Sequence, residues 1–103
     1  MSEYIVVMVT VPEWEAPGLA RTLVEERLVA CVNLATGLRS IYWWKGSIEN
    51  DKESLLIIKT KKSLASKLIK RVKELHSNEI PCVDIIPVTD GNKDYFKWIE
   101  ESI

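Results

Sequence analysis

Apolar residues follow two different spacings along the chain, and the spacing separates expected strands from expected helices. Near-continuous β-branched or aromatic runs are typical of interior strands, whereas apolar residues three or four positions apart indicate one face of a helix. The first pattern occurs at Tyr4–Val11, twice within Ala30–Thr60, and at Cys82–Val88. The second pattern occurs at Leu19–Leu28, Leu64–Leu75 and Lys93–Ile103. The sequence therefore predicts four strands and three helices.

The segment Ala30–Thr60 is predicted to form one unusually long hairpin. Ile41–Trp44 is a β-branched and aromatic run, Lys45-Gly46-Ser47 supplies the turn, and the strand resumes at Ile48. Gly46 can adopt the positive φ that such a turn requires. Strands in small domains usually have about five or six residues, so this hairpin is expected to extend beyond the body of the fold. An exposed aromatic patch there would favour association with other molecules, and we expect other copies of the chain to cover it.

The ends of the expected helices carry characteristic residues. Pro17-Gly18 is expected in the first turn of the first helix, where a missing amide donor is tolerated. Thr60 is a suitable N-cap for the second helix, and Asn92 for the third. Trp14 and Trp98 are expected to be packing residues, with Trp98 fastening the third helix to the sheet.

The order of elements is strand, helix, strand, strand, helix, strand, and a final helix. This βαββαβ order is that of ferredoxin-like α+β sandwiches, in which two helices cover one face of a four-stranded antiparallel sheet. Right-handed crossovers place the first and third strands in the middle, and Pro87 favours an edge position for the last. We expect a single domain over residues 1–103, with a bulge at Thr36-Gly37. A symmetric oligomer would cover the other sheet face.

Composition narrows the classes of function. The chain has 103 residues and a formal net charge of −1, so it lacks the basic surface of a general nucleic-acid binder. It also has no run of the roughly 20 apolar residues that span a membrane. Cys31 and Cys82 lack CxxC spacing and no export signal precedes them, so we expect a reduced pair in a cytoplasmic protein. No phosphate-binding glycine loop, HExxH motif or Ser/His/Asp grouping is present, and we expect no enzymatic activity.

Three residues are candidates for binding a divalent metal. His76 is the only histidine, Glu79 could join it across the following loop, and the thiolate of Cys31 would suit a soft or borderline ion. The alternative for His76 is a solvent-facing or helix-capping side chain, and for Cys31 a small core residue. The alternating carboxylates within Glu49–Glu53 either hold a hard cation or form a charged edge against mispairing.

Five motifs follow one another with characteristic spacing. They are Glu26–Asn33, Tyr42–Glu49, Lys59-Thr60, His76 ahead of Pro81, and Asp94-Tyr95 with Trp98. In this order they resemble the CutA divalent-cation tolerance family, over essentially the whole chain. The resemblance implies a ferredoxin-like protomer and a homotrimer joined by intersubunit strand pairing through the 30–60 hairpin. It also implies a cytoplasmic protein with a role in tolerance of copper and other divalent ions.

The resemblance also bears on the metal site. In the best-known member of the family, the copper ligands are a first-strand cysteine and two adjacent histidines before the last strand. They match about Val9, Leu75 and His76 here, so His76 alone keeps a ligand. The expected site comprises His76, Glu79 and Cys31 at clefts between protomers, taking Cu2+ or Zn2+ with no required cofactor. Such trimers are also similar to PII signalling proteins, so a regulatory trimer that binds a small anionic ligand is the rival expectation. An assembly without a specific ligand is the third.

Overall fold

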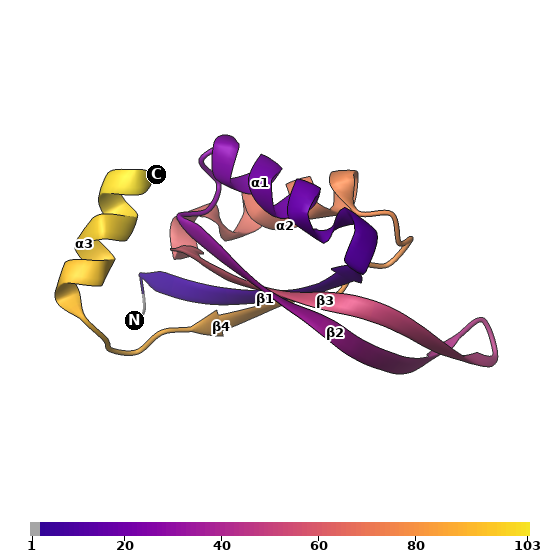
Figure 1. Ribbon diagram of the computed structural model, residues 1–103. Helices are drawn as coiled ribbons and strands as arrows, with labels where there is room; N and C mark the ends of the chain where they lie inside the picture. Colours follow the sequence, from indigo (N-terminus) through magenta and orange to yellow (C-terminus); the bar gives the residue numbers. More distant parts are fainter. Residues whose placement is uncertain (1–2) are drawn as a thin grey trace.

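The computed structural model describes residues 3–103, and its elements follow the predicted order (Figure 1). The strands are β1 (Tyr4–Pro12), β2 (Cys31–Trp44), β3 (Ser47–Lys61) and β4 (Val83–Pro87). The helices are α1 (Ala16–Glu25), α2 (Ala65–Leu75) and α3 (Lys93–Ser102), with 3-10 turns at Glu13–Glu15 and Lys62–Leu64. The antiparallel sheet has the order β2-β3-β1-β4, so the predicted central strands and the edge position of Pro87 are confirmed.

The core lies between one face of the sheet and the helices α1 and α2 (Figure 1). Every second residue of β1 is buried from Ile5 to Val11, because successive side chains of a strand point to opposite faces. The helices bring their own apolar stripes to this face, chiefly through Leu19, Leu23, Leu68 and Val72. Each fully buried aliphatic side chain contributes about 1.5–3 kcal/mol. This layer therefore supplies most of the stability of the protomer.

β2 and β3 form the long hairpin that the sequence predicted. They have 14 and 15 residues, against 9 in β1, and they extend past both helices (Figure 1). Trp44 pairs with Ser47, so Lys45 and Gly46 form a two-residue turn with φ of 49° and 83°, as in a type I′ turn. The expected bulge at Thr36-Gly37 is confirmed by a shift of register, with φ of 89° at the glycine. We call residues 38–53, which lie beyond this bulge, the arm.

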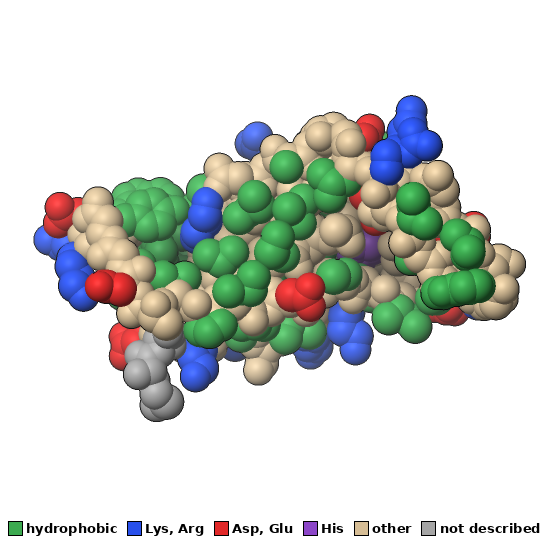
Figure 2. Space-filling model, turned by 90° about the horizontal axis from the view of Figure 1, so that it is seen from below, with side chains coloured by type: hydrophobic (Ala, Val, Ile, Leu, Met, Phe, Trp, Pro, Cys, Tyr) green, Lys and Arg blue, Asp and Glu red, His purple; other side chains and the backbone are tan. Residues whose placement is uncertain are grey.

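On the sheet face opposite α1 and α2, α3 contacts one end through Tyr4 and Lys61, and residues 3–103 leave the rest uncovered. The residues of β1 and β3 that alternate with the core residues lie half-buried on this face, among them Val6, Met8 and Ile57. Figure 2 shows hydrophobic side chains along the middle of the face and again at the end of the arm. A monomeric protein rarely exposes so continuous an apolar surface. The open face expected from the sequence is therefore present in the described part of this chain.

Thr60 does not cap α2, so that prediction is wrong. β3 continues past Thr60, which keeps the helix-facing register of Leu56 and Ile58 and is fully buried. A buried hydroxyl needs a partner, and this one donates to the carbonyl oxygen of Leu28 at 2.8 Å. α2 begins only after a 3-10 turn, with Leu64 at its N-cap position and no capping side chain.

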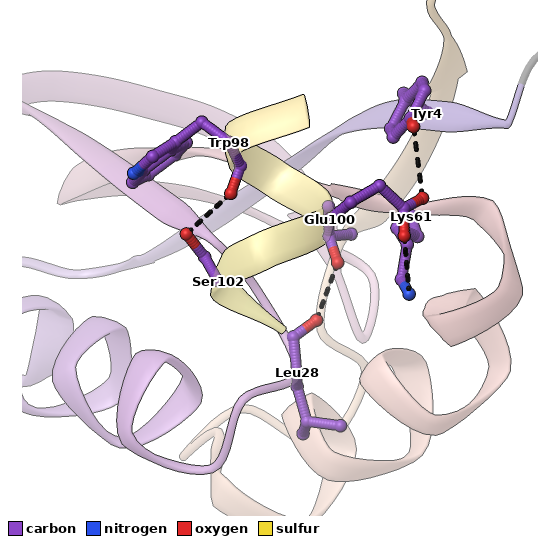
Figure 3. Close-up of polar contacts among 7 residues, drawn as sticks. Tyr4, Leu28, Lys61, Trp98, Glu100 and Ser102 are labelled. Atoms are coloured by element: carbon purple, nitrogen blue, oxygen red, sulfur yellow. Dashed lines mark hydrogen bonds and ion pairs between the residues drawn. The ribbon is translucent and has the colours of Figure 1, made fainter. Parts of the chain in front are cut away.

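Helix α3 lies at the end of the sheet opposite the arm (Figure 1) and is held there by few contacts. The rings of Tyr4 and Phe96 stack with their centroids 4.6 Å apart. The Tyr4 hydroxyl donates to Glu100 Oε1 at 3.1 Å, and Lys61 Nζ lies 3.4 Å from Glu100 Oε2 (Figure 3). The helix is thus attached to β1 and β3 by one aromatic stack and one shared carboxylate.

Two predicted packing roles are wrong in the protomer, and a predicted cap is confirmed. Trp98 is 43% exposed and stacks on Tyr95, whereas the next residue, Ile99, is 2% exposed and fastens α3 to the sheet. Neighbouring residues lie about 100° apart around a helix, so Ile99 can point inward while Trp98 lies at the border of the buried face. Trp14 lies in a 3-10 turn and is 79% exposed. Asn92 does cap α3, since its side-chain oxygen accepts from the amide of Asp94. No helix within residues 3–103 has the length and apolar character needed to cross a membrane.

Candidate functional site

His76 follows the last residue of α2, and its imidazole is buried. Nε2 lies 2.8 Å from the carbonyl oxygen of Thr10, and the amide of Asn78 donates to Nδ1 at 3.0 Å. A ring nitrogen that accepts a hydrogen bond carries no proton, so the proton is on Nε2, which donates to Thr10. Both nitrogens of this neutral imidazole therefore have partners in the same chain. The alternative of a solvent-facing side chain is wrong.

Glu15 completes the surroundings of His76. Its Oε1 lies 3.7 Å from His76 Nδ1 and accepts from the amide of Ser77 at 3.1 Å. The carboxylate side chain is largely buried. Together these contacts join the end of β1, the 3-10 turn after it and the start of the loop after α2. The imidazole and the carboxylate thereby position the loop Ser77–Ile80.

Glu79, the predicted partner of His76, meets the hairpin turn. Its Oε2 lies 3.9 Å from Lys45 Nζ, and both side chains are about 70% exposed (72% and 68%). The same ammonium lies 5.5 Å from the centroid of the Trp44 ring. Exposed ion pairs contribute little, because water solvates both groups in the open state. The contact therefore links the loop to the arm only weakly, and another cation can replace the Lys45 ammonium at Glu79.

Cys31 opens β2 opposite Lys59, at the end of the sheet that carries α3. Its Sγ is half-buried and lies 3.7 Å from Asn33 Oδ1. Burial raises the pKa of the Tyr95 hydroxyl in α3, and the nearby thiol of Cys31 adds to this rise. Cys31 is therefore close to α3, at the opposite end of the molecule from the arm turn that Glu79 approaches (Figure 1).

Cys82 is exposed, and like Cys31 it is a free thiol, as the sequence predicted. Burial of part of the side chain raises its pKa, and the carboxylate of Asp84, 3.5 Å from Sγ, raises it further. A thiol whose pKa is raised stays protonated at neutral pH, and the protonated form is neither a good nucleophile nor a good metal ligand.

The carboxylates within Glu49–Glu53 differ in their surroundings. Asp51 accepts a hydrogen bond from the hydroxyl of Tyr42 on the facing strand. This bond, with burial and the neighbouring carboxylates, raises the pKa of Tyr42 to about 12. Glu53 is buried where β1 ends, opposite Pro12. Asp51 thus joins the two arm strands through a side-chain hydrogen bond, a role that neither sequence alternative included.

A pocket of about 520 Å³ lies between the arm and the loop after α2. Tyr42–Trp44 forms its aromatic wall, and Ser77–Ile80 forms a wall that is mainly polar. Small-molecule sites in proteins usually have volumes of about 300–1,000 Å³. The pocket therefore has the size of a ligand site, and its two walls come from segments more than thirty residues apart in the chain.

The three predicted metal ligands are not brought together within one chain. Within residues 3–103, no group of three His, Cys, Asp or Glu side chains converges closely enough to hold a metal ion. Cys31 lies by α3, Glu79 lies by the arm, and His76 is buried under the loop. Structural zinc sites take four protein ligands and catalytic ones take three. A metal site made from these residues would need donors from more than one chain.

Sequence reasoning missed the contact of Glu15 with His76 and the pocket beside the arm. Both join segments that are distant in the sequence, and alternation of polar and apolar residues predicts the face of an element without predicting which loop that face meets. The only hint of the pocket in the sequence was that Lys45 and Glu79 have opposite charges. The two residues lie in different loops, and no rule of sequence spacing predicts that such residues meet.

Comparisons with known proteins place this architecture among relatives. The profile of the family described as CutA1 divalent ion tolerance protein matches residues 5–102. The divalent-cation tolerance protein CutA of Pyrococcus horikoshii is 47% identical over 98 residues, covering 94% of this chain and 95% of its own length. Protein CutA 1, chloroplastic, from Oryza sativa subsp. japonica is 46% identical over 99 residues, or 95% of this chain. This chain spans only about half of that plant relative, 56% of its length.

Solved structures show the same architecture. The crystal structure of CutA1 from Oryza sativa matches with a TM-score of 0.93 at 42% identity, over 98% of this chain and 94% of that one. CutA from Xylella fastidiosa matches with a TM-score of 0.94 at 35% identity, over 99% of both chains. A periplasmic divalent cation tolerance protein CutA from Archaeoglobus fulgidus matches with a TM-score of 0.91 at 35% identity, over 96% of this chain and 97% of its own. The agreement extends over nearly the whole chain, including the long hairpin and α3.

Proposed function

The chain belongs to the CutA1 divalent ion tolerance protein family, and from this premise we propose that it is a homotrimeric divalent-metal tolerance protein. In this proposal it binds metal ions at clefts between protomers and has no catalytic activity. The observation that supports the role is the family match over residues 5–102. The Pyrococcus relative, which this chain matches over almost its full length, is named for divalent-cation tolerance.

The proposed trimer follows from the uncovered arm. Trp43 is 72% exposed, and Ile41 and Ile48 beside it are also exposed, so the two-stranded arm presents a continuous apolar patch. β2 is an edge strand, and one side of its backbone has no strand partner in the protomer. Free edges and exposed apolar patches both favour association. Sister chains that pair with β2 and cover the arm would satisfy both.

The proposed metal donors are His76, Glu79 and Cys31, contributed by more than one chain. Glu79 can exchange its exposed pair with Lys45 for a cation, and Cys31 offers a half-buried thiol. His76 can bind a metal through Nδ1 only if it releases the amide of Asn78. Imidazole, thiolate and carboxylate together suit Cu2+ or Zn2+, with no other cofactor required.

The assembly is tested by sedimentation equilibrium, which should give three times the 11.8 kDa of one chain. The melting temperature should also rise with protein concentration, because association stabilises by mass action. A species of 11.8 kDa would contradict the proposal. So would a melting temperature that stays constant over a hundredfold dilution in a trimer shown to exchange subunits during the measurement.

Metal binding is tested by calorimetric titration of the assembled protein with Cu2+ and with Zn2+. The proposal expects saturable binding that weakens in Glu79→Gln and in Cys31→Ser but not in the matched control Cys82→Ser. Binding of nucleotides without any response to metal would instead favour the regulatory trimer. No binding of either kind would leave the assembly without a specific ligand.

The proposed location is the cytoplasm, where the free thiols of Cys31 and Cys82 would stay reduced. Fractionation of cells that express the protein, followed by immunoblotting, tests this. Recovery in a fraction outside the cytoplasm would overturn the proposed location without affecting the proposed metal site.

A further inference from the structure

The pocket between the arm and the loop after α2 has two walls of different chemistry. One wall, Tyr42–Trp44, presents aromatic rings, and the other, Ser77–Ile80, includes the carboxylate of Glu79. Aromatic faces carry partial negative charge because of the ring quadrupole. The carboxylate adds a full negative charge at the same opening. Both walls therefore favour a positively charged occupant over a neutral or negative one.

The structure already places an ammonium group at this opening. Lys45 Nζ lies 5.5 Å from the centroid of the Trp44 ring and 3.9 Å from Glu79 Oε2. Both distances are within the ranges for a cation–π contact and an ion pair. The lysine side chain is 72% exposed, so it rests at the mouth and does not fill the pocket. It marks the position that a cation prefers.

We propose that this pocket binds a small organic ammonium ion, which takes the place of the Lys45 ammonium between Trp44 and Glu79. The volume of about 520 Å³ accommodates an amine that carries apolar groups. Such a ligand buries its methyl or methylene groups against the rings and its charge against the carboxylate. A small inorganic anion would instead meet the charge of Glu79 and the negative ring faces.

The ammonium site shares Glu79 with the proposed metal site but requires different chemistry. A divalent metal ion needs several oxygen, nitrogen or sulfur donors in a defined geometry. An organic cation needs ring faces and a single counter-charge, all of which one chain supplies here. The two proposals share Glu79, but the ammonium site needs no donor from another chain, so a titration with an organic cation in the absence of metal tests it separately. The site also requires the mouth of the pocket to stay open in the assembly.

The test uses tetramethylammonium as the probe, with tert-butanol as a neutral ligand of similar shape and acetate as an anion. The full chain in its assembled state is titrated while the indole N–H signals of its tryptophans are followed by NMR. The proposal expects saturable shifts of Trp43 and Trp44 with tetramethylammonium only. Trp98, on α3 at the other end of the molecule, serves as the internal control.

Two variants sharpen the test in opposite directions. Glu79→Gln removes the counter-charge and should weaken binding of tetramethylammonium about tenfold. The matched control Glu25→Gln, which removes another exposed ion-paired carboxylate, should leave the affinity unchanged. Lys45→Asn removes the internal competitor and should strengthen binding about threefold to tenfold. Asn-Gly is a preferred type I′ pair, so this variant keeps the turn.

Three results would overturn the proposal. The first is binding of tert-butanol as tightly as tetramethylammonium, which would show an apolar pocket without charge preference. The second is tighter binding of acetate, which would favour an anionic ligand. The third is no shift of Trp43 or Trp44 with tetramethylammonium in either the wild type or Lys45→Asn. Because the probe is not a metal, a failed metal titration would not produce any of these results.

Discussion

The body of the protomer and its arm share the same two strands but meet opposite surroundings. In the body, β3 lies between β1 and β2, and Leu56 and Ile58 are fully buried beneath the helices. Beyond Glu53, where β1 ends, β3 has β2 as its neighbour, and Trp43 on that strand is 72% exposed. Strand propensity is high in both regions. The difference therefore lies in what covers the strands.

The comparison shows that an apolar pattern predicts that a surface will be buried. It does not predict whether the same chain or another chain buries it. In the body, the cover is α1 and α2, which the same chain supplies. In the arm, the chain supplies only the loop after α2, and that contact leaves a pocket. The proposed sister chains would complete the arm as the helices complete the body. Substitutions in the two regions should therefore respond differently to association.

The largest expected effect is in the arm. Trp43→Ala should lower the free energy of unfolding of the assembled protein by about 3–5 kcal/mol, as for truncation of a large aromatic side chain in a core. The reason is that sister chains are proposed to bury the indole, although the protomer exposes it. Chemical denaturation measures the change, and sedimentation should show partial dissociation of the variant.

Trp14→Ala is the matched control for the arm. Trp14 is 79% exposed and belongs to the body, so its truncation should change stability by no more than about 0.5 kcal/mol. If the two tryptophan variants unfold alike, with unchanged mass, the arm has no cover and the comparison between arm and body loses its basis.

In the body, Leu68→Ala should lower the free energy of unfolding by about 2–5 kcal/mol. Leu68 is fully buried in α2, and its truncation leaves a cavity against β1 and β3. Because this cavity is inside the protomer, the sedimenting mass should not change. The neighbouring surface variant Lys67→Ala should stay within about 0.5 kcal/mol of wild type. Dissociation of the Leu68 variant would show that the packing of the body also determines association through the arm.

Much of the body could be predicted from sequence, because its determinants are local. Pro87 indicates the edge strand, and the alternation in β1 indicates a buried face. In the arm, the turn is equally local, since Gly46 indicates it. Thr60 was misassigned because a hydroxyl residue can satisfy its hydrogen bond in several ways. Nothing near it in the sequence predicts that the carbonyl of Leu28 is its acceptor.

The candidate site was less predictable, because its contacts are made between loops. The sequence identifies side chains of types that can bind a metal, but the hydrogen-bond partners of His76 are a strand carbonyl and a loop amide. Both are backbone groups, and no side-chain pattern reports their position. The pocket beside Trp44 arises from the length of the arm and the path of the loop together. The length of the arm can be predicted from sequence, and so can the presence of the loop. Their contact depends on how the whole chain packs.

A smaller effect is expected from the pair that joins the two helices of the body. Arg71 donates two hydrogen bonds of 2.8 Å to the carboxylate of Glu26, and these bonds lower the pKa of that carboxyl. A lowered pKa in the folded state gives stability above the unfolded pKa of about 4.3 that is lost as pH falls through the folded value. The advantage of wild type over Glu26→Gln in urea denaturation should therefore vanish in acid.

Glu25→Gln provides the control for this pair. Glu25 pairs with Arg21 on the surface of α1, within one helix and at 3.6 Å, and so gives a weaker link than one between two helices. Glu25→Gln should therefore lower the free energy of unfolding at neutral pH by less than Glu26→Gln does. If the Glu26 variant matches wild type at neutral pH, the pair does not hold α1 to α2.

The smallest expected effect lies within the arm and appears at alkaline pH. The hydroxyl of Tyr42 donates to Asp51 on the facing strand, and this bond, with burial and the nearby carboxylates, raises the pKa of Tyr42 to about 12. The pKa in the unfolded chain is about 10. A raised pKa means that the contribution to stability is complete below pH 10 and is lost as pH rises toward 12. Wild type should therefore exceed Tyr42→Phe in stability at neutral pH and lose that advantage over this interval.

Titration of tyrosinate absorbance measures the pKa directly, since the signal missing in Tyr42→Phe belongs to Tyr42. Asp51→Asn keeps an acceptor oxygen but removes the charge, so the pKa of Tyr42 should fall part of the way toward its ordinary value. A Tyr42 that titrates near pH 10 in wild type would show that the bond to Asp51 does not persist. The two arm strands would then be held by their backbone ladder and by the hydrogen bond from Arg39 to Asn50. The stability of the arm would depend still more on the chains that are proposed to cover it.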